Sequence, residues 1–221
     1  MSKLTNLQGS PQNNVISCKG NEHTVLEARA IKAPKAGEML LKLRVVGFCG
    51  TDLFKLRTNN VSDGLVLGHE IVGEIIELGS GITHLAIGDR VVVPHHVSCG
   101  SCLFCQNGSE TMCEKFRENL IEPGGFADHV IVKHRATTHA AHKIPDEISD
   151  NTAVFLEPAA CVLRGINRSE LQLNGSAAIM GGGSMGLLHL LIIKAVNPNA
   201  KTLLIDPLEE RRILAKNLGA D

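Results

Sequence analysis

Four cysteines lie close together in one short stretch of this chain, and they constrain its folding more than any other sequence feature. They are Cys99, Cys102, Cys105 and Cys113, out of 7 cysteines among 221 residues. Because spacings of three, three and eight residues let four thiolates converge from one looped segment, the stretch is typical of a tetrahedral metal site. An odd cysteine count with this clustering favours a metal site in a reducing compartment over a disulfide framework.

The four-cysteine pattern favours zinc as the metal. Four thiolates leave no open coordination position, so zinc held here is structural. An iron–sulfur cluster is the alternative, and unliganded thiols are a third. The bacterial ferredoxin pattern has three residues before its fourth cysteine and a proline after it, whereas here seven residues separate Cys105 from Cys113 and Glu114 follows. We therefore predict one structural zinc.

Composition excludes several classes of protein. Hydrophobic residues make up 43% and charged residues 20%, as in ordinary globular proteins. The net charge is -1, Trp and Tyr are absent, and no basic run occurs, which argues against nucleic acid and anionic membranes as partners. The N-terminus lacks a secretory signal pattern, so we expect a cytoplasmic protein. The apolar run from 177 to 196 is interrupted by four glycines, His189 and Lys194, which argues against a membrane span.

The first 135 residues have the pattern of a β-rich region. Leu41, Leu43 and Val45 alternate with Lys42 and Arg44, which predicts a half-buried strand with the three apolar residues on one face. Glycine, proline and asparagine separate the apolar runs. The expected strands are 15–19, 23–31, 39–46, 70–78, 90–93 and 127–132.

The pattern changes near residue 149. Ser149 can cap a short helix, and Pro158 suits the first turn of a second helix that continues over 159–166. The remaining chain reads as strand, glycine turn, helix, strand and helix, a βαβ unit of an α/β fold. The segments are 177–180, 181–186, 187–196, 202–205 and 208–218.

The glycine turn has the spacing of a dinucleotide-binding loop. Gly181, Gly183 and Gly186 form the pattern G-x-G-x-x-G between a predicted strand and a predicted helix, and Asp206 lies twenty residues beyond Gly186. In that arrangement the glycines allow a pyrophosphate to approach the helix N-terminus, and the aspartate hydrogen-bonds a ribose hydroxyl. The alternative is an ordinary βαβ crossover without a ligand.

A second set of metal-binding residue types is spread over three segments. Cys49, His69 and Glu157 offer a thiolate, an imidazole and a carboxylate, a set that can hold zinc with a fourth position open. Each residue alone is more often a buried thiol, a core histidine or a surface acid. His95 and His96 fit no single ligand face, and we expect them in solvated loops.

Taken together, these motifs resemble the zinc-containing medium-chain alcohol dehydrogenases. The resemblance rests on three motifs that follow one another along the chain. They are Gly68-His69-Glu70-x-x-Gly73-x-x-x-x-x-Gly79, the segment from Cys99 to Cys113 that holds the four cysteines, here called the cysteine lobe, and the glycine turn. Cys49-Gly-Thr-Asp and Glu157-Pro158 resemble the sorbitol, threonine and polyol dehydrogenase branch. The resemblance implies a GroES-like catalytic domain over 1–160 and, over 161–221, a C-terminally incomplete Rossmann domain.

The resemblance also implies roles for individual residues. Cys49, His69 and Glu157 match catalytic zinc ligands, while Glu70 matches either a direct ligand or a catalytic near neighbour. Thr51 matches the hydroxyl that hydrogen-bonds the reacting alcohol and passes its proton outward. Where relatives often carry a histidine, this chain has Leu53-Phe54-Lys55, so the outer proton relay differs.

The implied function is hydride transfer between NAD and a secondary alcohol or polyol, with one catalytic and one structural zinc. We expect NAD to be preferred over NADP because Asp206 would repel a 2′-phosphate. The resemblance further implies a homo-oligomer, either a dimer or a tetramer. Two alternatives stay open, a truncated zinc-binding relative without turnover and an iron–sulfur electron carrier. The sequence does not name the alcohol.

Overall fold

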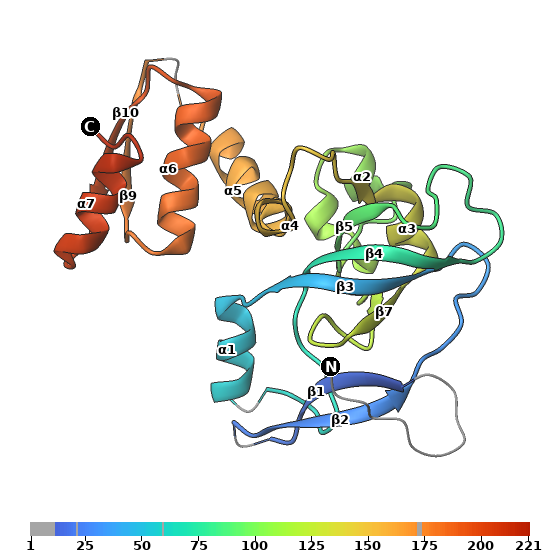
Figure 1. The fold of residues 1–221 in the computed structure, drawn as a ribbon. Coiled ribbons are helices and arrows are strands. Elements are labelled where there is room, and N and C mark those ends of the chain that lie inside the picture. Colours follow the sequence, from blue (N-terminus) through green and yellow to red (C-terminus); the bar gives the residue numbers. More distant parts are fainter. Residues whose placement is uncertain (1–11, 21, 59, 172–173) are drawn as a thin grey trace. The chain divides into compact units, whose positions relative to one another are not determined.

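The computed structural model describes residues 12–20, 22–58, 60–171 and 174–221. The chain divides into two units, Met1–Phe155 and Leu156–Asp221 (Figure 1). The domain boundary expected after residue 160 stays a prediction. Among the described residues, no helix is both long and apolar enough to cross a bilayer.

The first unit is built on β-strands, which are β1 (Gln12–Cys18), β2 (Thr24–Ala30), β3 (Met39–Gly47), β4 (Glu70–Leu78), β5 (Arg90–Pro94), β6 (Ile121–Glu122), β7 (His129–Val132) and β8 (His142–Lys143). Six of them form one antiparallel sheet in the order β6-β7-β3-β4-β5-β8. A separate hairpin pairs β1 with β2. The predicted strands form close to their expected bounds, whereas β6 and β8 are too short to give a sequence pattern.

Within the predicted alternation of Leu41, Leu43 and Val45, the pairing of β3 with β4 shifts by one residue. Leu41 and Leu43 pack in the main core, as expected, and Lys42 and Arg44 are exposed. Between Leu43 and Val45 the pairing with β4 shifts, so Val45 packs instead in a second cluster with Val72 and Val92. The expectation that Val45 shares the face of Leu41 was therefore wrong, because a bulge inserts one residue and reverses the face.

Short helices complete the first unit. The predicted cap at Ser149 is confirmed, because its side chain accepts a hydrogen bond from the Thr152 backbone N–H at 3.2 Å. Arg44 and Arg90 both bind the carboxylate of Asp150, at 2.6 and 2.7 Å, and hold that helix against β3 and β5. The helices are α1 (Gly50–Arg57), α2 (Leu103–Gln106), η1 (Glu110–Met112), η2 (Glu114–Arg117), α3 (His134–His139) and α4 (Asp150–Ala153).

The second unit has the predicted βαβ topology. Strands β9 (Ser176–Met180) and β10 (Lys201–Ile205) pair in parallel, and α6 (Ser184–Val196) connects them. Helices α5 (Leu156–Arg168) and α7 (Glu209–Asn217) precede and follow this unit (Figure 1). Ile179 and Leu204 pack with residues of α6 and α7 in one core, whereas Met180, Leu203 and Ile205 are exposed on the other face of the sheet.

Candidate functional site

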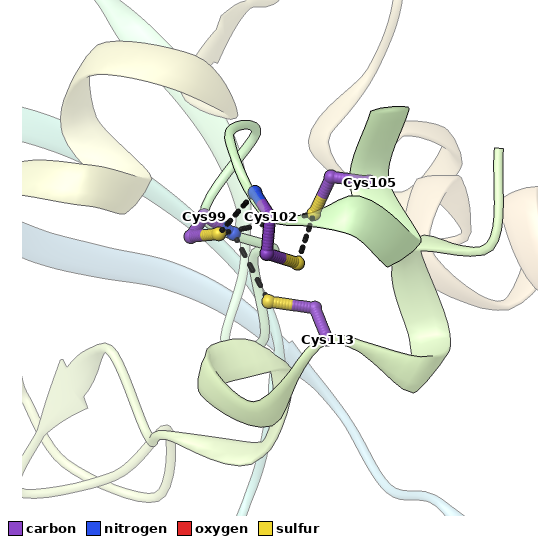
Figure 2. A group of neighbouring side chains, drawn as sticks. All are labelled: Cys99, Cys102, Cys105 and Cys113. Atoms are coloured by element: carbon purple, nitrogen blue, oxygen red, sulfur yellow. Dashed lines mark hydrogen bonds between the residues drawn. The ribbon is translucent and has the colours of Figure 1, made fainter. Parts of the chain in front are cut away.

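The four predicted thiolates converge in space. All four Sγ atoms lie within 4.8 Å of one another, and the Cys105 sulfur is 3.9 Å from that of Cys99 and 3.5 Å from that of Cys102 (Figure 2). Ligands at a Zn–S distance of about 2.3 Å in a tetrahedron are about 3.8 Å apart. The sulfur positions therefore fit one tetrahedral metal ion.

Backbone N–H groups point at these sulfurs. The Cys99 N–H donates to the Cys113 sulfur, and the Cys102 N–H donates to the Cys99 sulfur, both at 3.4 Å (Figure 2). Hydrogen bonds from Ser101, first from its backbone N–H and then from its hydroxyl, lower the pKa of Cys99 to about 5. Because the thiolate is the form that binds metal, these bonds favour the ligand state of Cys99. At Cys102 the bond from the Cys105 N–H lowers the pKa, but burial and the neighbouring thiols outweigh it and raise that pKa to about 11.

A second group of donors forms where β3 ends and β4 begins. Cys49, His69 and Glu70 place one ligand atom each within 4.8 Å of one another. The register pairs Gly47 with Glu70, and a Cβ at Gly47 would overlap the Glu70 carboxylate. Glycine at this position therefore leaves the room that the Glu70 side chain occupies.

A buried carboxylate organises this second group. Asp52, which is 1% exposed, accepts hydrogen bonds from the backbone N–H groups of Cys49 at 3.1 Å and Gly68 at 3.2 Å. Its Oδ1 atom also lies 3.4 Å from His69 Nδ1. The bond to Asp52, opposed by burial, raises the pKa of His69 to about 9. Burial alone would raise the pKa of Asp52, but these same bonds, that to His69 foremost, lower it.

The arrangement fits a zinc ion. With His69 Nδ1 directed to Asp52, the Nε2 atom is the one left to bind a metal, as in carboxylate–histidine–zinc triads. A thiolate, an imidazole and a carboxylate are donors that zinc accepts, and three protein ligands leave a fourth position open. Asp52 belongs to the Cys49-Gly-Thr-Asp motif, but the sequence did not predict its contact with His69. The signal was its place three residues after Cys49, where it also caps α1.

Two other predicted site residues, Thr51 and Glu157, lie on helices α1 and α5. Thr51 is exposed in the first turn of α1, and its backbone N–H lies 3.5 Å from the Cys49 sulfur. Glu157 is half-buried in α5 of the second unit, so its role as a ligand stays a prediction.

His95 and His96 are not in a solvated loop, and that expectation was wrong. Both side chains are half-buried, with ring centroids 3.6 Å apart, and the His95 ring lies 4.7 Å from that of His69. The cause is the register of β4 and β5, which pairs Glu70 with Pro94 and so brings the residues beside them together. Burial first, and then repulsion by His96, lowers the pKa of His95 to about 3.

The glycine turn connects β9 to α6 as predicted. Gly181 has a φ of 99°, and a Cβ at Gly186 would overlap the Gly181 carbonyl oxygen. Space is open around Gly183, which caps α6. Asp206 lies at the same turn: its Oδ2 accepts from the Gly182 N–H at 2.7 Å. This bond, followed by one from the Leu208 N–H, lowers the pKa of Asp206.

The chain is similar to known proteins over most of its length. Residues 35–146 match the family model of the alcohol dehydrogenase GroES-like domain. The chain is 34% identical over 199 residues to 2-dehydro-3-deoxy-L-galactonate 5-dehydrogenase of Pseudoalteromonas atlantica, covering 88% of this chain and 56% of that protein. It is 31% identical over 219 residues to sorbitol dehydrogenase of Bacillus subtilis, covering 95% and 60%. The chain thus spans little more than half the length of these relatives.

Solved structures show the same fold. An Escherichia coli alcohol dehydrogenase complexed with NADH matches with a TM-score of 0.83 and 29% identity, over 96% of this chain and 62% of that one. A putative zinc-binding dehydrogenase of Sinorhizobium meliloti bound to NADP matches with a TM-score of 0.82 and 28% identity, over 96% and 61%. The expected GroES-like domain followed by part of a Rossmann domain is confirmed. With half of its residues matching the family model, the chain belongs to the alcohol dehydrogenase GroES-like domain family, among relatives that include zinc-type and sorbitol dehydrogenases.

Proposed function

We propose that this chain is the metal-binding and first nucleotide-binding part of a zinc-dependent dehydrogenase of secondary alcohols or polyols. The observation that carries the proposal is the group of Cys49, His69 and Glu70, whose ligand atoms lie within 4.8 Å of one another with buried Asp52 against His69. The cysteine lobe is proposed as a separate structural zinc site. Assembly as a dimer or tetramer and a cytoplasmic location stay predictions.

Each residue of the site has a separate role in the proposed reaction. Zinc held by Cys49, His69 and either Glu70 or Glu157 would supply the positive charge that lowers the pKa of an alcohol. Asp52 keeps the His69 ring in one tautomer and orientation. The Thr51 hydroxyl accepts the proton of the reacting alcohol and passes it toward solvent, which its exposed position in α1 permits. The glycine turn holds the pyrophosphate of the nicotinamide cofactor.

The activity is tested on the full natural protein by following NADH formation from a panel of secondary alcohols and polyols, with the bound zinc counted by elemental analysis. We expect two zinc ions per chain and NAD-dependent oxidation. We expect Thr51→Ala to lower kcat by about 10² to 10⁴ fold, whereas Thr51→Ser retains most of it. Equal rates in the two variants would remove Thr51 from the mechanism, and one zinc ion in fully loaded protein would refute the two-site proposal.

We also propose that the cofactor is NAD rather than NADP. The support is Asp206, a buried carboxylate at the glycine turn, which would face a 2′-phosphate with like charge. Two such charges about 4 Å apart at an effective dielectric near 20 repel by roughly 4 kcal/mol before screening. Arg211, with its Nη1 atom 3.5 Å from Asp206, offsets part of that repulsion.

The cofactor proposal is tested by comparing kcat/KM for the two cofactors in wild type and in Asp206→Ser. We expect wild type to favour NAD and the substitution to reduce that preference. Both cofactors have to be compared, because one similar solved structure is bound to NADP. Equal use of both cofactors by wild type, or an unchanged ratio in Asp206→Ser, would overturn it.

A further inference from the structure

A loop from a distant part of the sequence packs against the segment that leads to His69. The Gly125 N–H donates a hydrogen bond to the carbonyl oxygen of Gly68 at 2.8 Å, and the Phe126 N–H donates to that of Leu67 at 2.9 Å. The carbonyl oxygen of Gly68 belongs to the peptide bond that joins Gly68 to His69. Gly125 therefore holds the peptide plane from which the His69 side chain extends.

The other polar backbone group of Gly68 is held by Asp52. The Gly68 N–H donates to Asp52 Oδ1 at 3.2 Å, so both the N–H and the carbonyl of Gly68 are paired, one with α1 and one with the loop. Asp52 also contacts the His69 ring. The backbone before His69 and the ring itself are thus fixed by different residues, Gly125 and Asp52. A ligand fixed in this way binds a metal with less ordering of the chain.

Glycine is required where the two segments meet. Gly68 has a φ of 86°, and a Cβ there would lie 2.9 Å from the Phe126 backbone nitrogen. A Cβ at Gly124 would overlap a backbone carbonyl oxygen, and one at Gly125 would lie 2.8 Å from the Gly68 carbonyl carbon. Because these distances are too short for non-bonded atoms, a methyl group on the loop has to push the two segments apart. His69 would then move with the segment that carries it.

The loop also reaches the segment that carries Cys49. The rings of Phe126 and Phe48 pack with centroids 5.9 Å apart, at an interplanar angle of 31°. Phe48 directly precedes Cys49, and its side chain is 61% exposed. Aromatic pairs at this separation attract each other. The Phe126 ring therefore restricts a side chain that would otherwise move freely next to a candidate ligand.

We propose that Gly125 and Phe126 are positioning residues that set how far apart Cys49 and His69 are held. Both residues act through neighbours, Gly68 and Phe48. This inference rests on the proposed function, because it concerns the same metal group. A protein in which the loop is displaced keeps all the donors but holds them at a spacing that suits one metal ion less well. It should bind zinc less tightly and in a changed geometry.

The test measures zinc affinity by chelator titration of the full natural protein. The phase of zinc release that Cys49→Ala abolishes is assigned to this site. We expect Gly125→Ala to lower that affinity about tenfold, the low end of the effect of groups that orient metal ligands. We expect Phe126→Leu, which keeps the backbone bond but loses the ring contact, to lower it about threefold. Phe126→Tyr keeps the ring and should retain the wild-type affinity.

Gly79→Ala is the matched control for a general loss of stability. A Cβ at Gly79 would overlap the Lys35 carbonyl oxygen, so alanine should destabilise the same unit. Gly79 follows the last residue of β4, whereas Glu70 is the first, so the zinc affinity of this site should be unchanged. Replacing zinc with Co²⁺ adds a spectroscopic measurement, because the visible absorption of Co²⁺ depends on the geometry of its ligands. We expect that absorption to shift in Gly125→Ala and to stay as in wild type in Gly79→Ala.

The outcomes separate this inference from the proposed function. Unchanged affinity and absorption in Gly125→Ala and Phe126→Leu, or an equal change in Gly79→Ala, overturn the positioning role, while NAD-dependent oxidation would still support the dehydrogenase. The expected changes without oxidation of any alcohol support the positioning role and overturn the dehydrogenase. A change in one of the two variants alone restricts the role to that residue. If Gly125→Ala does not fold, the comparison of Phe126→Leu with Phe126→Tyr decides. Wild type without zinc at Cys49 overturns both proposals.

Discussion

Replacing Asp52 with asparagine tests whether the buried carboxylate prepares His69 for a metal. The carboxylate receives three groups: the N–H of Cys49 at 3.1 Å, that of Gly68 at 3.2 Å, and His69 Nδ1 at 3.4 Å. An asparagine offers one carbonyl oxygen, and its NH₂ group then faces at least one of these donors. Leaving a buried donor unpaired costs about 1 to 3 kcal/mol, and the weakened helix cap adds about 1 kcal/mol.

We therefore expect Asp52→Asn to destabilise the protein by about 2 to 4 kcal/mol, which lowers the melting temperature by roughly 5 to 15 °C in a chain of this size. Because the asparagine no longer fixes the His69 ring, zinc affinity at this site should fall about 10 to 100 fold. The assays are thermal unfolding and zinc titration against a chelator of known affinity.

The control is Asp63→Asn. Asp63 lies 3.3 Å from Lys19, but its side chain is 77% exposed, so we expect a change within about 0.5 kcal/mol and unchanged zinc affinity. If Asp52→Asn lowers the melting temperature yet binds zinc as tightly as wild type, Asp52 caps a helix and does not orient His69. That result would refute the argument from the His69 contact.

Three further substitutions follow from the geometry. Cys99→Ala should remove one zinc ion per chain by elemental analysis, whereas Cys161→Ala, outside the cysteine lobe, should remove none. Gly186→Ala should lower stability to urea by more than about 2 kcal/mol because the new methyl group would overlap a backbone carbonyl oxygen, while Gly165→Ala, in open space on α5, should raise it by about 0.5 to 1 kcal/mol. Two lysines, Lys133 foremost, lower the pKa of the Glu122 carboxyl to about 2 in the folded protein, whereas in an unfolded chain it is about 4.3. The stabilisation of the fold by the ionised carboxylate is therefore present above about pH 4.3 and is lost as the pH falls toward 2. Acid unfolding of Glu122→Gln should lack this component, which its partial exposure limits to about 1 kcal/mol.

Local patterns in the sequence predicted most of the secondary structure. The alternation along β3 and the order of strand, glycine turn and helix from 176 to 196 each depend on neighbours within a few residues. The same holds for the cysteine lobe, whose four ligands come from one segment. These features could be predicted because the interacting residues are close in sequence.

Features that depend on strand register could not be predicted. His95 meets His69 only because β4 pairs with β5 in one particular register, and Asp52 reaches Gly68 across sixteen positions of sequence. The bulge that turns Val45 to the second cluster likewise depends on the pairing of β3 with β4. The family resemblance supplied the candidate metal ligands, but it did not reveal that Asp52 and His95 lie against His69.

The pairing of β3, β4 and β5 also makes metal retention at the proposed zinc site a check on correct folding. His69 and Glu70 reach their places because Glu70 lies opposite Gly47 on one side and Pro94 on the other. A chain that slipped by one residue in β4 would turn the Glu70 side chain to the opposite face of the sheet and separate it from Cys49. Misfolded molecules of this kind would be unable to hold zinc at Cys49, so exchange with a chelator would distinguish them from native molecules of identical mass and secondary structure.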